Sequence, residues 1–158
     1  MKRGQELIGL SVMDLEIGEE IGQVTDVFFD HQLQSILGLK IKKKKGRGQD
    51  FIPYEKLYSL GEDMVVIKDK NCIGECQERY QSLIDEGEVI GHKVISDQGE
   101  ELGMVEDILL NDNGKLVAYE LSEGLIQDIL EGRETLTIDN TVSYGKDAII
   151  VESSKRLP

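Results

Sequence analysis

Two pairs of adjacent glutamates, Glu19-Glu20 and Glu100-Glu101, are the residues that most resemble a chemical site. Two carboxylates held close together can act as a general acid and base or bind a metal ion. Each pair, however, follows a glycine. Adjacent residues on a strand point to opposite faces, and those in a turn point into water. We therefore interpret both pairs as parts of a turn that occurs twice in the chain.

Asp26 and Asp107 each follow a Val-x step in a strand-like run. A buried aspartate there must meet a backbone N–H, a basic partner or water, and a recurring bond that stabilises a turn would serve both places alike. No His, Ser or Lys recurs beside them, as a catalytic role would need. His31 and His92 fall at non-equivalent positions, which argues against a shared metal or proton-transfer site but leaves use in one place open. We predict no catalytic residue and no cofactor.

Cys72 and Cys76 lie four residues apart, a spacing that puts them on one face of a helix. Two thiolates could hold zinc, but a zinc site needs about four ligands and no others are clearly spaced to complete it. We favour the interpretation that both cysteines are small buried hydrophobic residues. A metal ion shared between subunits is the alternative.

The strongest local signal is a basic run at residues 40–48, where six of the eighteen basic residues fall within nine positions. The run contains the predicted loop from Lys43 to Gly48, and we call it the basic loop. The loop joins two predicted strands, so its charges should crowd one tip. Such a tip could contact the phosphates of RNA or of anionic lipid in a salt-sensitive way. The alternative is a solvated loop whose charge discourages edge-to-edge association. No aromatic residue interleaves the lysines, which disfavours sequence-specific RNA recognition. The basic residues are Lys40, Lys42, Lys43, Lys44, Lys45 and Arg47.

The matching place later in the chain holds an apolar segment at residues 122–133. Four large apolar residues at helical spacing predict a helix with one apolar face, ended by Gly132. We favour packing of this face within the chain, and contact with a second copy or another partner is the alternative. The residues of the face are Leu125, Ile126, Ile129 and Leu130.

An internal repeat explains these correspondences. Residues 18–30 (GEEIGQVTDVFFD) match residues 99–111 (GEELGMVEDILLN), and shorter matches lie upstream and downstream at an offset near eighty. A repeat of this kind indicates a duplicated structural unit. We call the two units the first and second copy.

Each copy has the pattern of short strands separated by glycine turns, as in the alternation of Leu37, Leu39 and Ile41 with Gly38 and Lys40. Short strands at frequent spacing favour a small closed barrel or a sandwich, and we prefer closure because an open sheet of short strands would expose its edges. The chain is therefore predicted to be mainly β: two tandem small antiparallel barrels joined by a short helix. We expect the first barrel at residues 1–70, a helical linker at 71–86, and the second barrel at 87–153 with a helix inserted near 122–132.

The charge of the chain is unevenly distributed. Residues 1–77 hold 11 basic and 13 acidic residues, a net of −2, whereas residues 78–158 hold 7 and 18, a net of −11. The total of −13 argues against wholesale wrapping of nucleic acid. No stretch approaches the ~20 apolar residues needed to cross a bilayer. We expect a cytoplasmic protein that could lie at the membrane surface.

The sequence resembles the PRC-barrel domain, twice and over nearly the whole chain. The resemblance rests on an Ile-Gly step, a glycine–glutamate turn ending at aspartate, an Ile-Pro step and a closing Gly-Glu-Asp turn, at residues 8–9, 18–26, 52–53 and 61–63. That family includes the cytoplasmic part of the photosynthetic reaction-centre H subunit and the C-terminal half of the ribosome maturation factor RimM. The resemblance implies the barrel fold but no shared catalytic set.

These observations favour a binding or assembly adaptor over an enzyme. The adaptor would dock a protein or ribonucleoprotein partner through the basic loop and the apolar segment. The alternative, which the H-subunit resemblance implies, is a peripheral membrane module that binds anionic lipid or a membrane complex. A metal-dependent enzyme is a distant third. The apolar segment also leaves open the formation of a homodimer.

Overall fold

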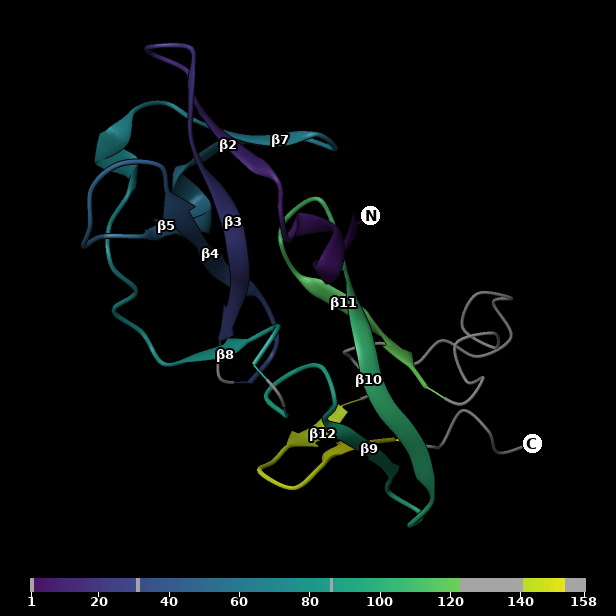
Figure 1. The fold of residues 1–158 in the computed structure, drawn as a ribbon. Coiled ribbons are helices and arrows are strands. Elements are labelled where there is room, and N and C mark those ends of the chain that lie inside the picture. The colour runs from purple at the N-terminus through teal and green to yellow at the C-terminus, as the bar shows by residue number, and fades with distance from the viewer. Residues whose placement is uncertain (1, 31, 86, 123–140, 153–158) are drawn as a thin grey trace.

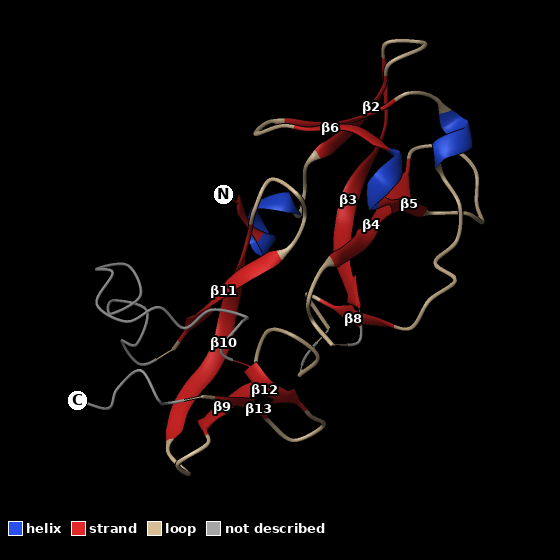
Figure 2. Ribbon diagram, turned by 180° about the vertical axis from the view of Figure 1, so that it is seen from behind, coloured by secondary structure: helices blue, strands red, loops and turns tan. Residues whose placement is uncertain are grey.

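The computed structural model describes residues 2–30, 32–85, 87–122 and 141–152. They form two curled sheets with short 3-10 turns (Figures 1 and 2), which confirms the mainly β prediction. The first sheet has the strand order β5-β4-β3-β2-β7-β6. Its strands are β2 (Ser11–Asp14), β3 (Glu19–Asp30), β4 (Ile36–Lys43), β5 (Phe51–Pro53), β6 (Leu57–Leu60) and β7 (Met64–Ile67).

The second sheet repeats this order, with β9 for β2, β10 for β3, β13 for β7 and β12 for β6, while β11 pairs with β10 as β4 pairs with β3. One pair in each copy is parallel, β2 with β7 and β9 with β13, a detail that the sequence pattern does not predict. The predicted helix near 122–132 lies outside the described residues. The strands are β9 (Lys93–Ser96), β10 (Glu101–Leu110), β11 (Leu116–Leu121), β12 (Thr141–Tyr144) and β13 (Ile149–Val151).

The prediction of a joining helix at residues 71–86 is wrong. The chain there makes one 3-10 turn, η3 (Lys70–Cys72), and then a short strand, β8 (Tyr80–Ser82). Gly74 exchanges two backbone hydrogen bonds with Phe51, and β8 pairs with β3. The backbone groups of this segment therefore find partners in the first sheet. Packing against that sheet overrides the helical spacing of the side chains.

Each copy lends its leading segment to the other copy. The N-terminal strand β1 (Lys2–Arg3) pairs with β10 of the second sheet, and the 3-10 turn η1 (Gly4–Leu7) follows it. Conversely β8, which precedes the second copy, pairs with the end of β3 in the first sheet. Figure 1 shows the N-terminus beside the β10–β11 pair and β8 across the lower end of β3. The two units are thus joined by a reciprocal exchange rather than by a helix.

Asp26 and Asp107 anchor these exchanged segments. Both are buried, and each lies at a β-bulge where the strand register shifts. Asp26 accepts hydrogen bonds from its own strand at Val27 N (2.7 Å) and from the other copy's leading segment at Ser82 Oγ and Ile84 N (3.3 Å). The recurring aspartate therefore has a structural partner in the backbone, as its sequence position predicts.

Asp107 repeats this arrangement in the second copy. Its Oδ1 accepts hydrogen bonds from Ile108 N (2.8 Å) and from Gln5 N (3.1 Å). Gln5 also donates its side-chain amide to the backbone oxygen of Glu106 (2.8 Å). The N-terminal segment is thus tied to the bulge of the second sheet just as residues 82–84 are tied to the bulge of the first.

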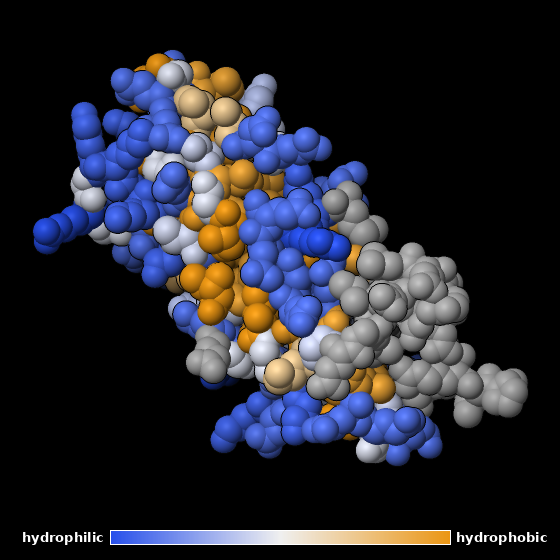
Figure 3. All heavy atoms as spheres, turned by 45° about the vertical axis from the view of Figure 1, so that its right-hand side comes forward, coloured by the Kyte–Doolittle hydropathy of each residue, from blue (hydrophilic) through white to orange (hydrophobic). Residues whose placement is uncertain are grey.

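One hydrophobic core runs through both copies. It includes Leu7 and Leu83 from the exchanged segments, each fully buried, beside Phe29 of the first sheet and Tyr119 of the second. In Figure 3 apolar atoms reach the surface as a band between charged margins. None of the helical turns within the described residues approaches the length and apolarity that a bilayer crossing requires. A shared core predicts that the copies unfold together.

The charge on Asp107 gives a pH-dependent prediction. Burial raises the pKa of Asp107 above its usual value. A carboxyl with a raised folded pKa costs stability when ionised, and that cost disappears as pH falls through the folded pKa. Because Oδ1 alone accepts both backbone bonds, Asp107→Asn keeps them without the charge. We expect this variant to melt a few degrees above wild type at pH 7.

The advantage of Asp107→Asn should shrink as the pH falls, because the wild-type carboxyl then takes up a proton and loses its charge. Thermal melts from pH 4 to 8 measure it. Asp107→Ala is the matched control, and it should be destabilised at every pH because Ile108 N and Gln5 N lose their acceptor. A loss for Asp107→Asn at pH 7 as large as that for Asp107→Ala would contradict the prediction.

Candidate functional site

A hollow of about 520 Å³ lies where the basic loop meets the turn between β2 and β3 and the 3-10 turn η3. We call it the basic hollow. Isoleucines give it apolar walls, and lysines outnumber glutamates by four to two around it. The lining residues are Ile17, Glu19, Glu20, Ile21, Lys43, Lys44, Lys45, Gln49, Lys70 and Ile73.

The turn between β2 and β3 forms one side of the hollow and is held rigidly. The buried carboxylate of Asp14 accepts hydrogen bonds from Glu16 N (2.9 Å) and Ile17 N (3.3 Å). Gly18 closes the turn with a positive φ of 67°, a conformation that favours glycine. Ile17 is consequently presented with 48% of its surface exposed.

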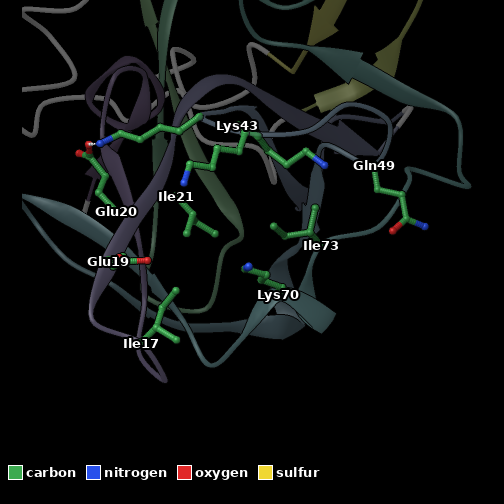
Figure 4. A pocket seen from close by; sticks show the side chains of 10 residues that line it. Ile17, Glu19, Glu20, Ile21, Lys43, Gln49, Lys70 and Ile73 are labelled. Atoms are coloured by element: carbon green, nitrogen blue, oxygen red, sulfur yellow. Dashed lines mark ion pairs between the residues drawn. The ribbon is translucent and has the colours of Figure 1, made fainter.

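The opposite side comes from the chain after β7. Asp69 caps η3 by accepting a hydrogen bond from Asn71 N (2.8 Å), which fixes the turn that carries Lys70. Ile73 follows this turn and packs partly against the core, as Ile21 of β3 does. In Figure 4 these two isoleucines flank the hollow, with Lys70 beside them. The site therefore joins segments about fifty residues apart in sequence.

The basic loop supplies the third side. The ladder between β3 and β4 continues to Lys44, whose N–H donates to the backbone oxygen of Ile21 (2.9 Å). The side chain of Lys43 donates to the backbone oxygen of Arg47 (3.3 Å), which folds the loop back on itself. These contacts direct three consecutive lysines, Lys43, Lys44 and Lys45, to the hollow.

One of these lysines is neutralised within the chain. Lys44 pairs with Glu20 at 2.5 Å, drawn as the dashed line in Figure 4. Hydrogen bonds from Lys44 and Ser11 hold the pKa of Glu20 below its usual value, so this carboxylate stays ionised. Within the described part of the chain, no ion pair is formed by Lys43, Lys45 or Lys70. The hollow is therefore left with uncompensated positive charge beside apolar walls.

The predicted cationic residues separate into two groups. Lys43, Lys44 and Lys45 line the basic hollow, whereas Lys40, Lys42 and Arg47 are exposed outside it. Buried Leu39 and Ile41 alternate with Lys40 and Lys42 along β4, as the period of two predicts. The predicted apolar face at Leu125, Ile126, Ile129 and Leu130 lies outside the described residues.

The other candidate residues either contact structural partners or lack the neighbouring ligands that a metal site needs. Glu101 pairs with Lys93 at 2.9 Å. His92 Nε2 lies 2.8 Å from the backbone oxygen of Gly145, and its ring contacts Tyr144. Cys72 and Cys76 are free and half-buried, but no helix places them on one face. Across the described ranges, His, Cys, Asp and Glu form no cluster of three that could hold a metal ion.

A second hollow, of about 460 Å³, lies at the junction of the two copies. Tyr144 donates its hydroxyl to the backbone oxygen of Glu88, and burial raises the pKa of both side chains. Glu88 in turn accepts a hydrogen bond from Ser82 N at 3.2 Å. These contacts tie β12 to the exchanged segment, so we interpret the residues here as parts of the junction.

Comparison with known families bears on the architecture. The model of the PRC-barrel domain matches residues 1–71 and again residues 86–158. The chain belongs to the PRC-barrel family. The match in two copies confirms the tandem arrangement that the repeat indicates. A search among curated proteins finds no match to this chain. Membership in the PRC-barrel family supports a generic binding or assembly module.

Sequence reasoning about this PRC-barrel protein misses part of the site. Lys70 is the last residue of the predicted first barrel, and Ile73 falls in the predicted linker. Ile17 lies between Glu16 and Gly18 in a turn rich in polar residues. Their proximity depends on the parallel pairing of β2 with β7, which brings the residues after β7 beside the β2–β3 turn. The run Lys68-Asp69-Lys70 directly after a strand is the one sequence signal that could have indicated a second source of positive charge.

Proposed function

We propose that this PRC-barrel protein is a non-catalytic adaptor of the cytoplasm and that the basic hollow docks a protein or ribonucleoprotein partner. The observation that carries the proposal is the combination of Lys43, Lys45 and Lys70, which form no ion pair with the described residues, with the apolar walls of Ile17, Ile21 and Ile73. Electrostatic complementarity steers an anionic partner to such a site, and apolar contact slows its release.

Affinity capture from a lysate of the native host tests the proposal. The triple variant Lys43→Ser, Lys45→Ser, Lys70→Ser should recover its specific partner at least about tenfold less well than wild type, because three phosphate- or carboxylate-facing charges are lost. The matched control is Lys40→Ser, Lys42→Ser, Arg47→Ser, which removes the same charge outside the hollow. Nuclease treatment separates a ribonucleoprotein from a protein. Equal recovery by both triple variants would contradict the proposal.

A second candidate is contact with anionic lipid. Leu15 and Ile17 are about half exposed at the tip of the β2–β3 turn, 50% and 48%, and lie next to the lysines. Exposed apolar residues beside lysines suit an anionic membrane surface. Glu16, however, lies between them and is exposed, so their insertion would bury a carboxylate. Sedimentation with phosphatidylglycerol vesicles tests this candidate, and it requires binding that falls with salt and with loss of the lysines.

A further inference from the structure

The chemistry of the basic hollow specifies the kind of occupant it would take. Three isoleucines offer contact to large apolar side chains, and three lysines without ion pairs in the described residues offer partners to carboxylates. A segment in which leucines or isoleucines alternate with acidic residues would satisfy both features at once. RNA would leave the isoleucines without apolar contact, and a lipid surface would bury Glu16.

This chain contains such a segment. The apolar segment, residues 122–133, carries three acidic residues and one basic residue, a net charge of −2 from −3 and +1. Its large apolar residues are Leu125, Ile126, Ile129 and Leu130. It follows β11, and the end of β4 with the residues after it occupies the matching place in the first copy, so the two copies differ at one equivalent place in complementary ways.

We propose that the basic hollow of one molecule binds the apolar segment of a second copy of the chain. The inference rests on the proposed function, because it assigns an occupant to the same hollow. The observation behind it is complementarity of charge and apolar character between two places that the repeat makes equivalent. The uneven charge of the chain, −2 in residues 1–77 and −11 in residues 78–158, would steer this head-to-tail contact.

The fold favours a second copy over the same chain. The segment begins at Ser122, whose side chain accepts a hydrogen bond from Met104 N (2.9 Å) in the second sheet. The basic hollow lies at the β2–β3 turn of the first sheet, at the far end of the molecule from β9 and β12 in Figure 1.

Each molecule carries both contact surfaces, so two copies can close a two-fold dimer with two such contacts, and more copies can form rings or chains. This geometry allows a complementation test with two variants of the full chain. The first is the hollow variant, Lys43→Ser, Lys45→Ser, Lys70→Ser. The second is the segment variant, Leu125→Ser, Ile126→Ser, Ile129→Ser, Leu130→Ser. Each keeps one half of the contact.

Sedimentation equilibrium should show that wild type self-associates with rising concentration and dissociates with salt. Each variant alone should remain a monomer, whereas an equal mixture should form a one-to-one dimer and nothing larger. The control variant Lys40→Ser, Lys42→Ser, Arg47→Ser should associate as wild type does. Circular dichroism melts verify that every variant is folded.

A labelled peptide of residues 121–134 tests the contact without the rest of the second sheet. Fluorescence anisotropy should show binding to the segment variant that weakens at least tenfold in the hollow variant. Monomeric wild type together with a peptide that does not bind would overturn the inference. If the lysines are still required for capture of a host partner, the proposed function stands and only the self-association fails. If the hollow and control variants lose peptide binding equally, the inference is also overturned.

Discussion

Replacing Asp26 with alanine is expected to lower the free energy of unfolding by about 3 kcal/mol, because the buried Val27 N–H, the buried Ser82 hydroxyl and the part-buried Ile84 N–H lose their acceptor. Val27 N and Ile84 N both donate to Oδ1, and the hydroxyl of Ser82 donates to the other oxygen. Asp26 is only 5% exposed, so water cannot easily replace the carboxylate. The loss would release the second copy's leading segment from the first sheet.

Chemical denaturation measures this effect, with Thr25→Ala as the matched control in the same bulge. Thr25 donates its hydroxyl to the backbone oxygen of Lys40 (3.3 Å) at an exposed site, so its loss should cost under about 1 kcal/mol. Asp26→Asn keeps an acceptor and should lie between the two. If Asp26→Ala is no less stable than Thr25→Ala, the aspartate does not anchor the exchanged segment.

The sequence predicts much of this fold because the relevant signals are local. The alternation along β4 and the Gly-Glu-Glu turns are determined within a few residues, and duplication shows them twice. The exchange of leading segments is different, because it joins Lys2 to Leu110 and Ser82 to Phe28. No local pattern distinguishes a segment that pairs with its own copy from one that crosses to the other.

The prediction of a linker helix failed for the same reason, because the local pattern does not show which strand the segment pairs with. Tyr80 stacks on Phe28 with ring centroids 3.9 Å apart, and Leu83 is fully buried. Both side chains also fit a helical spacing, so only the free edge of β3 decides between helix and strand. The residues of the basic hollow show the same dependence on strand pairing. Lys43 to Lys45 could be predicted because they are consecutive, whereas Lys70 required knowledge of which strands pair in parallel.

A second large loss of stability is expected when Arg3 is replaced. Arg3 lies in the first copy's leading strand and pairs with a buried glutamate in the second sheet. Glu120 is 6% exposed and its Oε1 forms an ion pair with Arg3 Nε. Among the described residues, this oxygen accepts no other hydrogen bond. Arg3→Met should cost about 2 kcal/mol, less than the ~3–5 kcal/mol of a fully buried pair, because the arginine side chain is 46% exposed.

Adding Glu120→Gln to Arg3→Met tests the cause of that loss. If the cost is an unpaired buried charge, the double variant should be more stable than Arg3→Met alone, since the amide carries no charge. If the cost is lost packing of the arginine stem, Glu120→Gln should not help. Both Arg3→Met and Asp26→Ala should shift one common unfolding transition, because each loosens a segment that one copy lends to the other. Two separate transitions would show instead that the copies unfold independently despite their shared core.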